Sequence, residues 1–348
     1  MGSDTVLKLD YLSLAELAAR PAAWWQDVMG IAAFDADEPP APFADIPMVA
    51  VRIPLLGGSP QRYEVWRSDQ GMRSGERGRI QYKVAAGTVF GRLTLTESEF
   101  GAKPGETSAL QRVTELGYRE IFALLDALST PHLLRVWNYL PDINGESHGS
   151  ERYWQFNSAR QDAFIACGRT VTGAVPAACG VGSPLGTAII IYFLASATAP
   201  TVIENPRQVS AYNYPPEYSP RSPTFSRACL ADFSNGQMLF ISGTASILGH
   251  ATVHHGDAAA QAHETLRNIE ALIDEANRVG GRRATFTMRS LCYKAYVRHA
   301  ADRALIEREL TQALGSRAQV LYLRSDLCRP DLLVEIEATG SHLVNDKS

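Results

Sequence analysis

The stretch Cys328-Arg329-Pro330-Asp331-Leu332-Leu333-Val334-Glu335-Ile336-Glu337-Ala338 lies close to the end of the chain. Apolar Val334 and Ile336 alternate with Glu335 and Glu337, which is the spacing of a β-strand with two different faces. Two interpretations of Glu335 remain open. It is either a solvated charge on a surface strand or a carboxyl group that lines a pocket and donates a proton.

The sequence before this stretch alternates between strand and helix patterns. Asp257 is a good N-cap for a helix that runs to Arg278 and stops at Gly280. A second helix is expected over 300–314, ending at Gly315. The expected strands lie over 237–246, 284–297, 318–323 and 332–338.

The first half of the chain repeats this order. Strands are expected over 87–96, 132–139 and 188–195, and helices over 107–128 and 155–167. Corresponding elements of the two halves are offset by about 150 residues, which predicts an internal duplication. In the late strands Tyr192 corresponds to Glu335, 143 positions later, so a duplicated fold need not carry a duplicated site.

A segment rich in proline, tyrosine and arginine, 200–227, joins the two halves. Its prolines exclude a helix or a central strand, and it is too aromatic for a disordered linker. Because long irregular segments in compact chains are usually functional, we expect it to form part of a pocket. Residues 1–84 are less regular, although Trp24, Trp25 and Met29 suggest a packed helix.

The composition is that of a soluble globular protein. The 348 residues are 45% hydrophobic and 20% charged, with a formal net charge of −4, which argues against nucleic-acid and membrane partners. The five cysteines form no C-x-x-C motif, so reduced thiols are expected. The N-terminal residues lack a signal-peptide pattern, and the apolar run 188–195 is too short to span a bilayer. A cytoplasmic location is therefore expected.

Motifs for nucleotides and metals are weak. Gly180-x-Gly182-x-x-x-Gly186 contains a proline and leads into a strand, unlike a dinucleotide loop. The histidines at 250, 254, 255 and 263 have no standard ligand spacing, so no metal site is expected.

The second half resembles the reactive-intermediate deaminase (Rid/YjgF) fold. The resemblance rests on Ile241-Ser242-Gly243, on Gln261…Thr265-Leu266-x-Asn268-Ile269 and on Val334-Glu335-Ile336-Glu337-Ala338. In that family an arginine before the final strand holds the substrate carboxylate, which points to Arg317. The first carboxylate of the last motif positions a water or a proton, which points to Glu335.

Across most of its length the chain is similar to the chorismatases. The similar motifs are Arg135-Val136-Trp137-Asn138-Tyr139, Glu151-Arg152-Tyr153 leading to Phe156-Asn157 and Arg160, the tyrosine–proline segment, and Leu327-Cys328-Arg329-Pro330-Asp331. The resemblance implies an α+β fold of two Rid/YjgF-like halves, with mixed sheets and helices packed on one face. We expect domains over 1–180 and 181–348, with 200–227 forming the pocket.

Chorismatases remove pyruvate from chorismate. The family implies three branches, which yield a dihydroxy-cyclohexadiene acid by hydrolysis, 3-hydroxybenzoate, or a mixture of 3- and 4-hydroxybenzoate. The branch forming 3-hydroxybenzoate has a glycine where the hydrolytic branch has an alanine, and a cysteine near the catalytic glutamate. Gly243 and Cys328 occupy these positions, so we expect a 3-hydroxybenzoate synthase acting through an arene-oxide-like intermediate.

The residues themselves suggest how such a site works. Glu335 would protonate the enol ether, which requires a raised pKa in a desolvated pocket, and Cys328 would assist proton transfer or shape the wall. The two carboxylates of chorismate would be held between the halves by cationic and hydroxyl donors. The candidates are Tyr153, Arg160, Tyr212, Arg221, Arg227 and Arg317. No cofactor is expected, since loss of pyruvate and isomerisation conserve the oxidation level.

Taken one at a time, these residues have ordinary interpretations. Arg160 and Arg221 would be surface or salt-bridge residues, Cys328 a small buried side chain, and Gly243 a strand glycine that allows close packing. A non-enzymatic Rid-like binding protein and an imine deaminase remain alternative functions. The duplicated architecture is compatible with a monomer, because it would supply internally an interface that Rid proteins build between subunits.

Overall fold

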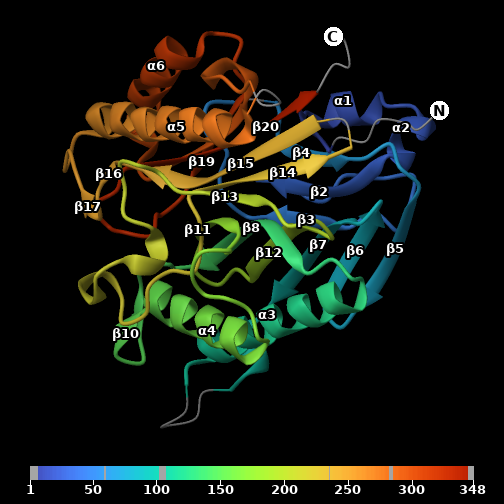
Figure 1. Ribbon diagram of the computed structural model, residues 1–348, viewed down its shortest axis with the longest axis horizontal. Coiled ribbons are helices and arrows are strands. Elements are labelled where there is room, and N and C mark those ends of the chain that lie inside the picture. The colour runs from blue at the N-terminus through green and yellow to red at the C-terminus, as the bar shows by residue number, and fades with distance from the viewer. Residues whose placement is uncertain (1–6, 59, 102–106, 235, 282–284, 344–348) are drawn as a thin grey trace.

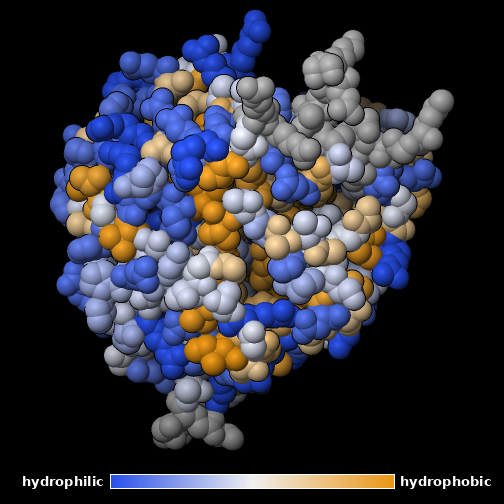
Figure 2. Space-filling view, viewed as in Figure 1, coloured by the Kyte–Doolittle hydropathy of each residue, from blue (hydrophilic) through white to orange (hydrophobic). Residues whose placement is uncertain are grey.

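Two six-stranded sheets and one four-stranded sheet enclose a common core, and the longer helices lie outside them (Figure 1). The computed structural model describes residues 7–58, 60–101, 107–234, 236–281 and 285–343. Figure 2 shows one face largely covered by hydrophilic side chains. Apolar side chains gather near the middle of that face, where β13 (Thr201–Ile203) and β14 (Ala228–Phe233) cross it between the helical layers.

The first six-stranded sheet has the order β11-β8-β12-β7-β6-β5, with β11 and β8 parallel and the other neighbours antiparallel. Two helices, α3 (Ala109–Ala127) and α4 (Arg152–Ala166), accompany it. Ser108 caps α3 with a capping box. The strands are β5 (Met72–Arg77), β6 (Ile80–Ala85), β7 (Thr88–Leu95), β8 (His132–Pro141), β11 (Ala177–Ser183) and β12 (Ile189–Ser196).

The second six-stranded sheet repeats this topology in the order β19-β18-β20-β15-β14-β13, again with a single parallel pair, β18 and β19. Its helices are α5 (Ala258–Gly280), capped by Asp257 as predicted, and α6 (Arg303–Leu314), which ends at Gly315. The expected α+β class with mixed sheets and helices on one face is confirmed. The remaining strands are β15 (Gly236–Ala245), β18 (Cys292–Val297), β19 (Val320–Arg324) and β20 (Val334–Leu343).

The N-terminal part forms a sheet that the sequence patterns did not predict, with the order β1-β4-β2-β3. Trp24 and Trp25 lie in a short helix as expected, but Met29 lies in a strand. The elements are β1 (Lys8–Leu12), α1 (Leu14–Ala18), α2 (Ala22–Gln26), β2 (Val28–Phe34), β3 (Met48–Val51) and β4 (Tyr63–Arg67).

Short elements connect these layers. Two small hairpins are formed by β9 (Glu146–Ser147) with β10 (Ser150–Glu151), and by β16 (Ile247–Leu248) with β17 (Ala251–Thr252). Single 3-10 turns are η1 (Glu97–Glu99), η2 (Ala211–Asn213), η3 (Pro216–Tyr218), η5 (Met288–Ser290) and η6 (Ala300–Asp302).

The inner faces of all three sheets contribute to one central core, which contains Phe34, Trp66, Trp137, Tyr192 and Phe240. The opposite face of β20 packs under α5 and α6 through Val334 and Ile336. The alternation predicted for this strand is therefore observed, but both of its faces are buried. Glu335 and Glu337 point towards the central core and not towards solvent.

Several boundaries differ from those expected. Strand β18 begins at Cys292, after the turn η5, and Ala284 lies outside the described residues. Strand β11 was not anticipated, and a division of the chain at residue 180 would cut through it. Strand β12 pairs with β7 and β8 of the first sheet, so a division that follows strand pairing falls between Ser196 and Thr201.

Candidate active site

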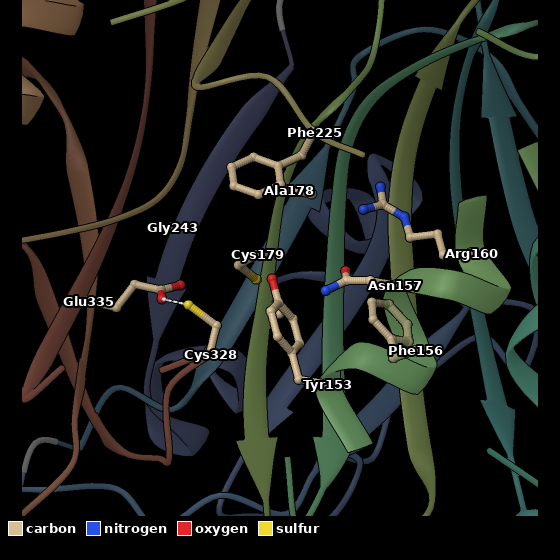
Figure 3. Close-up of a pocket in the computed structure, with 11 residues that line it drawn as sticks. Tyr153, Phe156, Asn157, Arg160, Ala178, Cys179, Phe225, Gly243, Cys328 and Glu335 are labelled. Carbon is tan, nitrogen blue, oxygen red and sulfur yellow. Dashed lines mark hydrogen bonds between the residues drawn. The ribbon is translucent and has the colours of Figure 1, made fainter. Parts of the chain in front are cut away.

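A pocket lies where the edge strand β11 of the first sheet faces β15 of the second (Figure 3). Helix α4, β11, the segment before β14, β15 and the end of the chain all contribute to its walls. The lining residues are Tyr153, Phe156, Asn157, Arg160, Ala178, Cys179, Gly180, Phe225, Gly243, Cys328 and Glu335. The pocket is therefore built from both halves of the chain, as the sequence predicts.

Glu335 is the acidic group of this pocket, and it is only 4% exposed. Burial raises its pKa, and the negative charge of Glu337 raises it further, to about 8. The positive charges of Arg135, Arg227 and Arg298 offset part of this rise. A carboxyl group in this environment keeps its proton near neutral pH and has the property required of a general acid.

Cys328 lies beside this carboxyl group, with its Sγ 4.0 Å from Glu335 Oε2. Burial and the neighbouring Glu335 raise the pKa of the thiol to about 12. Cys328 is therefore a neutral thiol near neutral pH, which suits it to donate to the carboxyl oxygen and not to act as a base.

Gly243 provides the space that the Glu335 carboxyl group occupies. A Cβ added at this position would overlap Glu335 Oε1 and lie 2.8 Å from its Cδ. The register between β15 and β20 shifts between Ile241 and Thr244, so Gly243 lies in an irregular part of the strand. A side chain at 243 would therefore displace the carboxyl group of Glu335.

Arg160 supplies unpaired hydrogen-bond donors to the pocket from α4. It is 2% exposed, and its Nε and Nη2 have no partner among the described residues. The guanidinium group is packed against the rings of Tyr118 and Phe164, at 5.1 and 5.3 Å from their centroids. A buried arginine with free donors is costly in a protein unless an anion completes the site.

Tyr153 and Asn157 lie on the same face of α4 as Arg160 and point into the pocket (Figure 3). Burial raises the pKa of Tyr153 well above its ordinary value, so the phenol remains a neutral donor. The spacing of these residues, at three and four positions along a helix, is what brings them together.

Arg227 is buried behind the pocket wall. Its Nη2 donates to Tyr214 Oη at 2.6 Å and to the carbonyl oxygen of Val209 at 2.7 Å. Its guanidinium group lies 5.4 Å from the ring centroid of Phe225, which does line the pocket. Arg227 therefore supports the wall formed by the 200–227 segment and contributes positive charge near Glu335.

Besides Arg227, three further candidates are not brought to the pocket lining. Arg221 forms an ion pair with Asp162 at 2.6 Å and has a half-exposed side chain. Tyr212 is half-buried in η2. Arg317 is exposed in the turn between α6 and β19, and β19 is an edge strand separated from β20 by β18. That separation is why an arginine close to Glu335 in sequence is remote from the pocket.

Arg298, which the sequence patterns did not single out, anchors the segment that carries Cys328. Its Nε donates to the carbonyl oxygen of Leu332 at 2.7 Å, and its Nη2 donates to that of Arg329 at 2.8 Å. Phe225 and Cys179 were also missed as lining residues. The only signal for Cys179 was its position next to the glycine motif at 180–186, which is the edge strand and not a nucleotide loop.

Within the described ranges, no cluster of three or more His, Cys, Asp or Glu side chains is arranged to hold a metal ion. Among the same residues, no helix has the length and apolarity needed to cross a membrane. The pocket combines a carboxyl group with a raised pKa on one wall and a buried guanidinium group on another, an arrangement suited to acid catalysis on an anion.

Comparisons with known proteins agree with this class. A family model described as "Chorismatase FkbO/Hyg5-like, N-terminal" matches residues 64–195, which end one residue before the end of β12. A 3-hydroxybenzoate synthase of Streptomyces hygroscopicus is 37% identical over 287 residues, covering 79% of this chain and 80% of that protein. A chorismatase of Streptomyces rapamycinicus is 36% identical over 280 residues, with the same coverage.

The structure of this chain aligns with a crystal structure of a chorismatase with a TM-score of 0.84 and 30% sequence identity. The alignment covers 98% of this chain and 100% of the chorismatase chain. The chain therefore belongs to the chorismatase family.

Proposed function

We propose that this enzyme converts chorismate to 3-hydroxybenzoate and pyruvate, with Glu335 as the general acid. The observation that carries the proposal is a buried carboxyl group with a pKa of about 8, facing a buried arginine whose Nε and Nη2 are unpaired. Chorismate is an anion with two carboxylates and an acid-sensitive enol ether, which is the chemistry these two groups serve.

In the first step, the proton of Glu335 is transferred to the methylene carbon of the enolpyruvyl group. The ether carbon then becomes oxocarbenium-like, and the bond between the ring carbon and the ether oxygen weakens. Arg160 binds a substrate carboxylate through its free Nε and Nη2, and Tyr153 and Asn157 supply further donors. These contacts hold the ether within reach of Glu335.

In the second step, the ring hydroxyl oxygen attacks the neighbouring ring carbon as the pyruvate oxygen leaves, and the hydroxyl proton passes to the ionised Glu335. The resulting arene-oxide-like intermediate opens at its other carbon–oxygen bond, the ring proton at the oxygen-bearing carbon is transferred to the phenol oxygen, and the ring becomes aromatic. The two products together contain all the atoms of chorismate, so no water is consumed. The ionised Glu335 recovers its proton in the course of this isomerisation.

Gly243 and Cys328 support this branch of the family over hydrolysis. Without a side chain at 243, the Glu335 carboxyl group lies against β15. The neutral thiol of Cys328 lies 4.0 Å from Glu335 Oε2 and is suited to relay a proton during aromatisation.

The test is incubation of the purified protein with chorismate, followed by identification of the products by chromatography and mass. We expect equal amounts of pyruvate and 3-hydroxybenzoate. The dihydroxy-cyclohexadiene acid, which contains one added water, would instead establish the hydrolytic reaction. Absence of turnover above the uncatalysed decay would refute the enzymatic function and favour a binding protein.

We also propose a cytoplasmic monomer with a pocket-forming 200–227 segment. Sedimentation of the purified chain, at concentrations spanning those of the activity assay, tests the oligomeric state.

A further inference from the structure

A buried network of charges lies next to Glu335 on the inner face of β20. Glu337 accepts hydrogen bonds from Arg135 Nη2 at 2.6 Å and from Trp137 Nε1 at 2.7 Å. It also forms an ion pair with Lys294 Nζ at 2.7 Å. These side chains are at most 5% exposed, so each ion depends on its partners for the stabilisation that water would otherwise give.

The network extends away from the pocket to a second carboxylate. Lys294 Nζ lies 2.6 Å from Glu64 Oε2, and it donates to Tyr192 Oη at 3.0 Å. Trp66 Nε1 donates to Glu64 Oε1 at 2.7 Å. With two carboxylates and two cations, the network is neutral when all four groups are ionised. It also ties β4 to β8, β18 and β20.

Glu335 and Glu337 have unequal surroundings although they share one face of one strand. Among the described residues, Glu335 forms no ion pair, and the thiol of Cys328 lies 4.0 Å from its Oε2. Glu337 has two cations and an indole donor. When two carboxyl groups are close and only one is paired with cations, the paired one ionises and its charge disfavours ionisation of the other.

We propose that Glu337 is a positioning residue whose fixed negative charge keeps Glu335 in the protonated form that serves as proton donor. The inference rests on the proposed function for the use made of that proton. Burial alone would raise the pKa of Glu337, but Lys294 and Arg135 hold it below its ordinary value. Its charge in turn is the largest contribution after burial to the raised pKa of Glu335.

Other groups face Glu335 from each element packed against it. The positive charges oppose the effect of Glu337, and the neutral thiols and phenol leave it unchanged near neutral pH. They are Arg135 on β8, Tyr153 on α4, Cys179 on β11, Arg227 before β14, Arg298 after β18 and Cys328 before β20. Since the arginines are present together with Glu337, the contribution of Glu337 must be isolated by substitution.

The experiment is an infrared titration of the carboxylic acid C=O band of Glu335, identified by its absence in Glu335→Gln. In the unaltered protein we expect the band to titrate near pH 8. In Glu337→Gln the midpoint should fall by about one unit or more, because a neighbouring negative charge has been removed. The pH at which kcat/KM with chorismate falls to half its maximum on the alkaline side should move down by the same number of pH units.

Glu64→Gln is the matched control, because it removes an equally buried carboxylate from the far end of the same network. It should lower the thermal midpoint as much as Glu337→Gln while moving the Glu335 band by less than half as much. Arg135→Gln should move the band in the opposite direction, since it removes a positive charge. A reversal of sign would not result from general structural damage.

The proposal is overturned if Glu335 is already ionised at pH 6 in the unaltered protein, whichever variants fold. It is also overturned if Glu64→Gln and Glu337→Gln shift the band equally, or if Arg135→Gln lowers the midpoint. The band is read without substrate, so a protein that titrates as expected but does not consume chorismate would refute the proposed function and leave this inference standing.

Discussion

The two six-stranded sheets have one topology but different inner faces. On β12 of the first sheet, Tyr192 is packed among aromatic residues and joined to Glu64 and Lys294 by hydrogen bonds. On β20 of the second sheet, the residue that the sequence repeat predicts to correspond is Glu335, which has no ion pair within the described chain. The duplication therefore supplied two similar walls, and only one of them carries a reactive group.

The helices that accompany the sheets differ in the same way. Helix α4 of the first half turns Tyr153, Asn157 and Arg160 into the pocket, whereas α6 of the second half contributes no lining residue. Under the proposed function, each half provides what the other lacks, a proton donor from β20 and anion-binding donors from α4. A site of this kind requires the two halves to be present together.

Removing the proton donor should have the largest effect. We expect Glu335→Gln to lower kcat by about 10²–10⁴-fold with chorismate, because the amide keeps the shape but cannot donate the proton. Steady-state assay of pyruvate release checks this. Glu217→Gln, at an exposed position in η3, serves as the control and should retain most of the activity. Near-normal turnover of Glu335→Gln would contradict the proposal that β20, unlike β12, carries the proton donor.

The same substitution should change how stability depends on pH. The folded-state pKa of Glu335 lies above its unfolded value, so folding takes up a proton between about pH 4.5 and pH 8, and stability falls as pH rises through this window. Glu335→Gln lacks this loss, so it should be more stable than the original protein at pH 8, by on the order of 2–4 kcal/mol. Chemical denaturation at pH 5 and pH 8 measures the difference. Equal stability differences at the two pH values would contradict it.

Substitution on α4 tests the contribution of the first half. Arg160→Gln should raise KM for chorismate by about ten- to one-hundred-fold, since it removes a charged donor from a buried site. Arg221→Gln, at the exposed end of the ion pair with Asp162, should change KM by less than about twofold. Arg317→Gln should behave like Arg221→Gln, because Arg317 is exposed outside the pocket. A larger effect of Arg317→Gln than of Arg160→Gln would mean that Arg317, and not Arg160, binds the substrate carboxylate.

The smallest expected change comes from Gly243→Ala. The added methyl group overlaps the Glu335 carboxyl group, which must rotate away from β15. We expect kcat to fall by about tenfold and the share of the dihydroxy-cyclohexadiene acid among the products to rise. Product ratios by chromatography measure this, with Gly180→Ala as a control. Its added methyl would come no closer than 3.3 Å to Tyr153. An unchanged product ratio in Gly243→Ala would show that residue 243 does not decide between 3-hydroxybenzoate formation and hydrolysis.

Local patterns predicted most of the regular elements, because caps, periodicity and glycine stops act within a few residues. Asp257 caps the start of α5 and Gly315 follows the end of α6, as predicted. The N-terminal sheet and β11 were missed, since short or glycine-containing strands give little periodicity and owe their pairing to neighbours distant in sequence. Motif resemblance identified Glu335, Cys328, Gly243, Arg160 and Tyr153, all of which line the pocket.

The sequence by itself determined the alternation of β20, the repeat of the two halves and the residue types at the site. Each of these depends on neighbours along the chain. Only the tertiary structure decided that both faces of β20 are buried, that Glu337 and not Glu335 is paired with Arg135 and Lys294, and that Arg317 lies away from the pocket. Desolvation and ion pairing depend on which distant segments are packed against a residue, and these set the pKa of Glu335 and with it the chemistry of the site.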